Sequence, residues 1–190
     1  MKRRSAIVFA VAALAASIPV AVRVAAPAAQ PRARVSSHQA CGYDRWTVKT
    51  LQDRSQLMQT EASSVRALGV LPRPLSLPSE RLPQEHRVYV LTAKVISTQT
   101  ETDGDLHVVL SAGGRTMLAE VPNPACTTKA TPFRRRQMTA ARRRISFCRA
   151  RVTGVLFFDY ALGQYGHAPN YAELHPLLAF RCLYWSHRQL

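Results

Sequence analysis

Residues 86–121 decide the fold, and they read HRVYVLTAKVISTQTETDGDLHVVLSAGGRTMLAEV. The first part is rich in β-branched and aromatic residues, which is typical of a β-strand. The dipeptide Asp103-Gly104 favours a hairpin turn, and Gly113-Gly114 marks a second tight turn. LHVVLS (106–111) and RTMLAEV (115–121) have the composition of strands on either side of that second turn. We therefore predict a meander of three antiparallel strands.

A helix and two more strands are predicted to follow the meander. A helix is expected from Pro132 to Phe147, because Thr131 can cap it and proline suits its first turn. RVTGVLFFDY (151–160) and AELHPLLAF (172–180) have strand composition. Three strands, one helix and two strands are the element order of an OB-fold, a five-stranded Greek-key barrel. The predicted fold class is mainly β: an OB-like five-stranded barrel with one helix between strands 3 and 4.

The chain before the barrel has a composition of its own. Lys2-Arg3-Arg4 and the apolar stretch after it predict an N-terminal signal peptide, or an uncleaved membrane anchor helix. Four prolines between Leu71 and Pro83 predict an extended strap, and a short helix is expected at 60–68 before it. The predicted organisation is a signal peptide or anchor (1–28), a disordered spacer (29–40), an N-terminal extension with the strap (41–84), the barrel (85–182) and a C-terminal tail (183–190).

The four cysteines agree with export. An even number of cysteines in an exported chain suggests two disulfides, and no Cys/His spacing typical of a structural zinc site is present. Cys126 and Cys148 flank the predicted helix, so we expect them to pair and Cys41 to pair with Cys182. The predicted location is periplasmic or secreted, with attachment to the membrane by the N-terminal segment as the alternative.

The charge of the chain points to anionic partners. The net charge is +15, and residues 41–190, with 20 basic and 11 acidic residues, keep a net charge of +9. A basic surface favours nucleic acid, acidic polymers or anionic lipid. Guanidinium groups suit phosphate because they donate paired hydrogen bonds. The predicted polyanion-binding residues are those of the helix: Arg134, Arg135, Arg136, Arg142, Arg143 and Arg144. The alternative interpretation is a solvated helix face whose charge is incidental.

Two Asp/Glu-x-His pairs form a candidate metal or acid–base site. Asp105 and His107 lie two apart on one predicted strand and therefore share a face, as do Glu173 and His175 on another. Carboxylate and imidazole groups in this number can hold a metal ion if the strands bring them together. The alternative interpretation is that each carboxylate orients its neighbouring histidine by a structural hydrogen bond.

Five segments carry a resemblance to known proteins: CGYDRWTVKT (41–50), RLPQEHRVYV (81–90), DGDLHVVL (103–110), TMLAEVPNPAC (116–126) and VTGVLFFDYALGQYGHAPNYAELHP (152–176). Through them the chain resembles a family of exported bacterial proteins of unassigned function, with DGDxH and APNxxELHP motifs. The resemblance implies an exported OB-like domain and brings no activity with it. The chain departs from the family pattern at Leu162, where the family usually has His, and at Leu156, where it usually has Gly.

The Asp103-Gly104-Asp105 turn is also similar to the turn of staphylococcal nuclease, an enzyme of the OB type. That similarity implies a calcium ion as cofactor and a catalytic set of Asp103, Asp105, Arg115 and Glu120. In such chemistry an arginine neutralises the phosphate and a carboxylate handles the attacking water.

The sequence is therefore compatible with three functions. The first is a non-enzymatic exported domain that binds nucleic acid or another polyanion. The second is a metal-dependent nuclease or phosphodiesterase. The third is a structural protein of the cell envelope. The oligomeric state is left open.

Overall fold

The computed structural model describes residues 41–42 and 44–184. The signal or anchor segment, the spacer and most of the predicted C-terminal tail lie outside the described residues. Among the described residues, neither length nor hydropathy qualifies any helix as a membrane-spanning segment.

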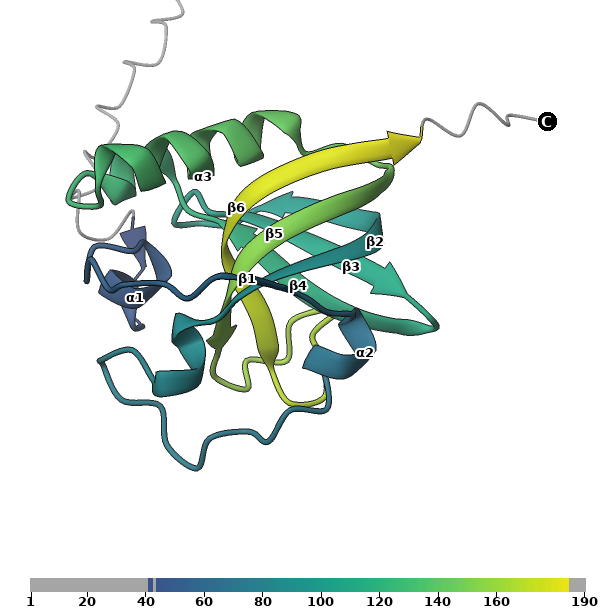
Figure 1. Ribbon diagram of the computed structural model, residues 1–190, viewed down its shortest axis with the longest axis horizontal. Helices are drawn as coiled ribbons and strands as arrows, with labels where there is room; N and C mark the ends of the chain where they lie inside the picture. Colours follow the sequence, from purple (N-terminus) through teal and green to yellow (C-terminus); the bar gives the residue numbers. More distant parts are fainter. Residues whose placement is uncertain (1–40, 43, 185–190) are drawn as a thin grey trace, which may run out of the picture. The chain divides into compact units, whose positions relative to one another are not determined.

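A closed β-barrel forms the body of the protein (Figure 1). Its five strands are β2 (Val88–Thr100), β3 (Leu106–Ala112), β4 (Arg115–Val121), β5 (Arg149–Phe158) and β6 (Ala172–Tyr184). The strands pair in the order β2-β3-β4-β6-β5, and β5 pairs back to β2 to close the barrel. The predicted OB-like fold is confirmed, including the position of the single helix α3 (Pro132–Arg144) between the third and fourth barrel strands.

The core fills the barrel with the inward-facing residues of the strands. Leu110, Met117, Val152 and Leu174 are fully buried, and Phe180 is 1% exposed. The helix α3 covers one end of the barrel and packs against β6 and β4. Met138 and Ala141 of this helix are buried against the barrel. The side chain of Thr131 caps the helix by accepting a hydrogen bond from the N–H of Arg134 (3.3 Å).

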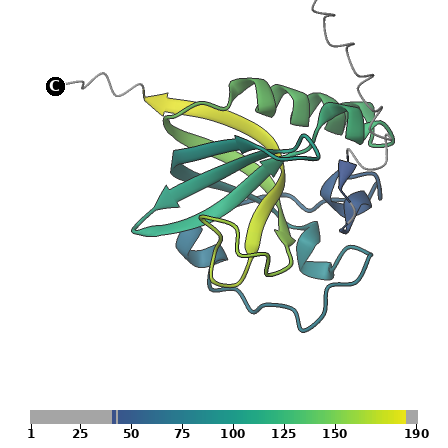
Figure 2. The same ribbon diagram turned by 180° about the vertical axis from the view of Figure 1, so that it is seen from behind.

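The N-terminal extension packs onto the barrel through short elements. These are α1 (Trp46–Lys49), β1 (Thr60–Ala62), α2 (Val65–Leu68) and the 3-10 helix η2 (Pro83–His86). The proline-rich strap between α2 and η2 runs along the side of the barrel away from α3, near the β5–β6 loop (Figure 2). There Arg73 donates hydrogen bonds to the carbonyls of Asn170 (2.9 Å) and Asp159 (2.9 Å).

The predicted helix at 60–68 is wrong over its first half. Residues Thr60–Ala62 form the strand β1, which pairs with β2 in parallel and places Thr60 opposite Val88. Helix α2 starts only after Ser64, whose hydroxyl accepts a hydrogen bond from the N–H of Ala67 (3.1 Å). An exposed strand edge can satisfy backbone groups that a local pattern assigns to a helix.

The two disulfides join other partners than the sequence predicted. Cys41 bonds to Cys126, and Cys148 bonds to Cys182. The predicted pair Cys126–Cys148 fails because the 13 residues of α3 lie between them, and such a helix is roughly 20 Å long. Cys148 pairs with Cys182 because β5 and β6 are antiparallel neighbours, with Ala150 opposite Cys182. Two disulfides are typical of an oxidising compartment.

Candidate functional site

Five ionisable side chains, here called the charged cluster, meet at one end of the barrel: Asp105, His107, Glu120, Glu173 and His175. The pairing of β3 with β4 places His107 opposite Glu120, and the parallel pairing of β4 with β6 brings Glu173 alongside Leu118. Asp105 directly precedes β3, and His175 follows Glu173 by two residues on β6. The structure therefore brings both predicted Asp/Glu-x-His pairs into one cluster.

His175 lies at the centre of the charged cluster and is fully buried. Its Nδ1 lies 3.1 Å from Oε1 of Glu173, as a hydrogen bond, and 3.2 Å from Oε2 of Glu120. Its Nε2 lies 3.7 Å from Oδ2 of Asp105, beyond hydrogen-bond distance. Among the residues that the structure describes, Nε2 has no hydrogen-bond partner.

His107 shares Glu120 with His175. Its Nδ1 lies 3.1 Å from Oε1 of Glu120 and 3.4 Å from Oε1 of Glu101. Neither contact has hydrogen-bond geometry, so this buried nitrogen also lacks a hydrogen-bond partner within the described part of the chain. Each oxygen of Glu120 thus faces one histidine.

The turn before β3 fixes the position of Asp105. The N–H of Asp105 donates to Oδ1 of Asp103 (3.0 Å), and the N–H of Asn123 donates to Oδ1 of Asp105 (2.7 Å). Gly104 has a φ of +85°, and a Cβ there would collide with the side chain of Asn123. Glycine is required at this turn, and Oδ2 of Asp105 is left to face His175.

Lys49 brings a positive charge from the N-terminal extension. It lies in α1, and its Nζ donates a hydrogen bond to Oδ2 of Asp159 (3.2 Å) at the end of β5. Sequence analysis missed both residues. The signal that could have found them is their place in two segments that carry the family resemblance, CGYDRWTVKT and VTGVLFFDY.

A second buried ion pair anchors α1 to the barrel. Nη1 and Nη2 of Arg45 donate to the two carboxylate oxygens of Glu85, both at 2.6 Å. Glu85 also accepts the N–H of Phe158 (3.0 Å), and the guanidinium of Arg45 lies over the ring of Phe157, 4.7 Å from its centroid. This pair holds α1, and with it Lys49, against the end of the barrel.

A cavity of about 170 Å³, here called the acidic cavity, opens beside the charged cluster. Lys49 is the only lysine or arginine among its described lining residues, and Leu162 and Gln164 border it from the β5–β6 loop. Six of the 11 acidic residues of the chain line it: Asp44, Glu101, Asp103, Asp105, Glu120 and Asp159. The cavity therefore attracts cations, although the chain as a whole is strongly basic.

Contacts within the cluster outweigh burial and shift the pKa values of His175 and Glu120 in opposite directions. Burial by itself would lower the pKa of His175, but contacts with Glu120 and Glu173 outweigh it and raise that pKa to about 10. Burial would likewise raise the pKa of Glu120, but the two histidines beside it lower that pKa below its usual range. Glu120 is thus an anion between two imidazole rings.

The other two carboxyls of the cluster shift upward. Burial raises the pKa of Asp105 to about 6, against the attraction of His175. Burial, with the charge of Glu120, raises the pKa of Glu173 to about 7. For Lys49, burial would lower the pKa, but Asp159, Glu173 and Glu120 together raise it. The cluster carries more negative charge than Lys49 alone balances, and bound protons make up part of the difference.

The structure does not bring the whole predicted catalytic set together. Asp103, Asp105 and Glu120 all line the acidic cavity. Arg115 is exposed at the other end of β4, and five residues of strand separate it from Glu120 by roughly 17 Å. Arg115 therefore does not join the other three residues of the set at this cavity.

The six predicted polyanion-binding arginines of α3 fall into two groups. Arg135, Arg136, Arg143 and Arg144 are exposed. Arg142 turns inward, and its guanidinium donates to the carbonyls of Val121 (2.8 Å) and Gly104 (2.9 Å). Arg134 is half-buried, and its Nη1 donates to Oε1 of Gln137 (2.8 Å). Four of the six are thus free to face a partner.

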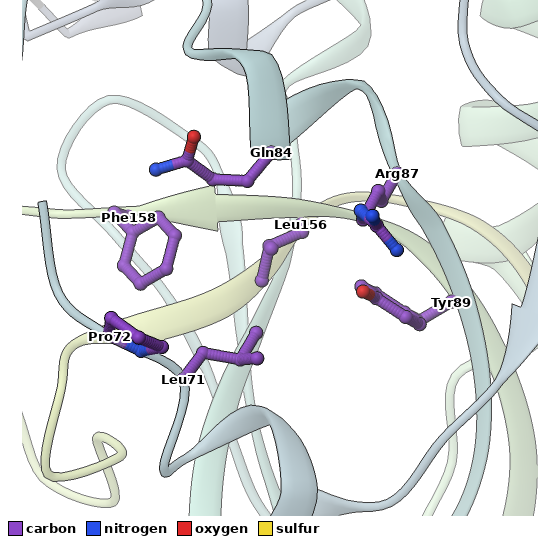
Figure 3. Close-up of a pocket in the computed structure, with 7 residues that line it drawn as sticks. All are labelled: Leu71, Pro72, Gln84, Arg87, Tyr89, Leu156 and Phe158. Carbon is purple, nitrogen blue, oxygen red and sulfur yellow. The ribbon is translucent and has the colours of Figure 1, made fainter.

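A separate pocket of about 400 Å³ lies between the strap and the barrel (Figure 3). Leu71, Leu156 and Phe158 give it an apolar wall, and Gln84 and Arg87 supply polar groups from the other side. Leu156 is one of the two positions where the chain departs from the family pattern. No sequence pattern predicted this pocket, because the strap that forms one wall is distant in sequence from β5.

No family model matches the chain, and no curated protein is significantly similar to it. Among solved structures, the aspartyl tRNA synthetase from Entamoeba histolytica is similar over 72% of this chain, at 12% sequence identity and a TM-score of 0.35. The chain spans 28% of that synthetase. The class of protein is set by the fold itself: a mainly β protein with an OB-like closed barrel.

Proposed function

We propose that the chain is an exported basic OB-like domain that binds a polyanion, nucleic acid first, through the outer face of α3. The supporting observation is that four arginines of one helix are exposed and have no ion-pair partner among the described residues: Arg135, Arg136, Arg143 and Arg144. Unpaired guanidinium groups keep their charge and their donors available for phosphate or sulfate.

The surface of α3 also has a shape that suits an elongated ligand. Arg135, Arg136 and Arg143 line an open groove of about 310 Å³ together with Thr139. A flexible anionic chain laid along this groove would meet Arg135 and Arg136 on one turn and Arg143 about two turns further on. Export to the periplasm or the medium fits the two disulfides and the signal-like N-terminal segment.

The decisive experiment compares two double variants of equal charge. Arg136→Ala with Arg143→Ala removes two arginines from the groove, whereas Arg66→Ala with Arg115→Ala removes two exposed arginines from elsewhere. Binding of labelled single- and double-stranded DNA is measured by fluorescence anisotropy over a range of salt concentrations. We expect the groove variant to bind at least about tenfold more weakly. The slope of log affinity against log salt concentration should also be smaller by about two, because two phosphate contacts are lost.

The Arg66/Arg115 variant is the control that distinguishes binding at the groove of α3 from general attraction by the positive charge of the domain. The Arg66/Arg115 variant should bind as the wild type does. Equal loss in both variants would contradict the proposal, and so would tight binding that salt does not weaken. An acidic polysaccharide tested in parallel shows whether phosphate is required. No binding to any polyanion would favour the structural envelope protein.

Metal-dependent hydrolysis of a phosphodiester is the less supported alternative. Asp105 and Glu120 lie together, but the cavity that holds them is acidic and Arg115 is distant. The same DNA incubations with calcium and with chelator test it. Calcium-dependent cleavage that is lost in an Asp105→Ala variant would favour nuclease activity over simple binding as the function of the protein.

A further inference from the structure

The acidic cavity and the buried His175 beside it favour a cationic ligand, whereas the exposed arginines of α3 favour an anionic one. Six carboxylates gathered in one cavity repel phosphate and attract cations. A cluster of acids alone does not define a site. The second observation is His175, which is fully buried and whose Nε2 points toward Asp105 without a hydrogen-bond partner in the described chain.

The environment of His175 prepares Nε2 as a ligand. Its Nδ1 lies 3.1 Å from Oε1 of Glu173, at hydrogen-bond distance. Because the pKa of His175 is about 10, the metal-free ring is protonated at neutral pH, and an ion that binds there displaces the Nε2 proton. When Nδ1 then donates its hydrogen to a carboxylate, the lone pair of the neutral imidazole is left on Nε2. Histidines that bind metals commonly donate their other ring N–H to a carboxylate in this way, which fixes the tautomer and the ring orientation.

The spacing of the candidate ligand atoms also fits one ion. One ligand atom from each of Asp105, Glu120 and His175 lies within 4.8 Å of the other two. Bonds of roughly 2.0–2.2 Å place two ligands of one metal roughly 3–4 Å apart. The 3.7 Å between Nε2 of His175 and Oδ2 of Asp105 lies in that interval. Oε2 of Glu120 lies 3.2 Å from Nδ1 of the same ring, so the Glu120 carboxylate has to turn toward Nε2 to complete the site.

We propose that Asp105, Glu120 and His175 bind a divalent transition-metal ion such as Zn²⁺ or Mn²⁺, which reaches them through the acidic cavity. Two carboxylates with one imidazole favour such ions over Ca²⁺, which prefers oxygen ligands alone. Glu173 acts as a positioning residue for His175. Lys49 does not block the site, because its ammonium group is engaged with Asp159 at 3.2 Å. The proposal does not depend on polyanion binding by α3.

The test is a metal titration of the purified, oxidised, chelator-treated protein. Isothermal titration calorimetry with Zn²⁺ and with Mn²⁺ is expected to show one site, and Ca²⁺ is expected to bind far more weakly. Asp105→Asn removes a ligand charge but keeps an oxygen that can accept the N–H of Asn123. We expect it to weaken Zn²⁺ binding at least about tenfold.

Asp44→Asn is the matched control, because Asp44 is an exposed carboxylate in the lining of the same cavity. It should bind Zn²⁺ as tightly as the wild type does. Equal weakening in the two variants would mean general attraction by the acidic cavity and would overturn the proposal. The absence of binding in the wild-type protein would overturn it as well.

A spectroscopic measurement on the wild type keeps the test decisive if the variant does not fold. In protein with ¹⁵N-labelled histidine, Zn²⁺ is expected to shift the Nε2 resonance of one histidine while its Nδ1 stays protonated. Histidine resonances that do not change on saturation with Zn²⁺ would show that His175 is not a ligand.

Discussion

At the level of single residues, the charged cluster shows how burial turns ordinary side chains into a coupled set. Asp105, Glu120 and Glu173 have almost no exposed surface, and each lies near an imidazole or an ammonium group. Removing one member would leave a buried charge without its partner, which is more costly than losing an exposed ion pair. The cluster therefore responds to pH as a unit.

The first prediction concerns stability against pH in the presence of a chelator. The folded-state pKa values of Asp105, Glu173 and His175 are about 6, 7 and 10, each above its ordinary value of 3.8, 4.5 or 6.5. The folded protein therefore binds more protons than the unfolded chain between about pH 4 and pH 10, and stability falls as pH rises through that window.

We accordingly expect the free energy of unfolding, measured by urea titration, to be larger at pH 5 than at pH 9. The lowered pKa of Glu120 has the opposite effect, but only below its usual value of 4.5. In the Asp105→Asn variant the fall between pH 4 and pH 6 should be smaller. Stability that rises from pH 5 to pH 9 would contradict this description of the cluster.

At the level of elements, α3 joins two roles in one helix. Met138 and Ala141 pack against the barrel, whereas Arg136 and Arg143 face solvent. The capping signal at Thr131 and the proline in the first turn made the helix predictable from the sequence. Local signals did not reveal that Arg142 reaches back to the turn at Gly104, because that contact depends on how the helix lies against β6 and β4.

The second prediction compares the inward-facing Arg142 with the exposed Arg143 in two neighbouring variants. Arg142→Ala removes two hydrogen bonds to backbone carbonyls, and bonds of this charged kind contribute about 1.5–3 kcal/mol. Arg143→Ala changes an exposed residue, so stability should stay within about 0.5 kcal/mol. Chemical denaturation measures both variants.

Polyanion affinity should rank the same variants in the opposite order. If DNA binds along the groove of α3, Arg143→Ala should weaken binding more than Arg142→Ala does. A stability loss for Arg143→Ala as large as that for Arg142→Ala would contradict the assignment of Arg142 as the inward-facing arginine.

At the level of the whole molecule, the N-terminal extension is part of the barrel domain. Three kinds of contact hold it: the ion pair Arg45–Glu85, the pairing of β1 with β2, and the disulfide Cys41–Cys126. Through these contacts the extension supplies Lys49 to the charged cluster and one wall to the acidic cavity. The site at this end of the barrel is therefore incomplete without residues 41–50.

The third prediction concerns the disulfide connectivity. Trypsin would place each cysteine in a separate peptide, 35–45, 116–129, 145–149 and 182–188. Mass spectrometry of a non-reduced digest should find 35–45 linked to 116–129, and 145–149 linked to 182–188. A link between the peptides of Cys126 and Cys148 would contradict the structure. Loss of either disulfide should lower stability by about 2–4 kcal/mol.

The sequence by itself determined the order of elements, and with it the class of fold. The sequence signals that predicted these elements are local, so each specifies the structure of only a few neighbouring residues. They are the strand alternation, the turns at Asp103-Gly104 and Gly113-Gly114, and the helix cap at Thr131. The sequence also placed Asp105, His107, Glu173 and His175 in two pairs on strands. Whether the pairs would meet depended on strand order, which local signals do not encode.

Only the tertiary structure decided which distant groups meet. The closure of the barrel brought β6 beside β4, and this pairing placed His175 between Glu120, Glu173 and Asp105. It excluded Arg115 from the site, exchanged the predicted disulfide partners and brought Lys49 to the cluster. The physical reason is that such contacts join segments far apart in the chain, where burial and packing of the whole domain select the partners.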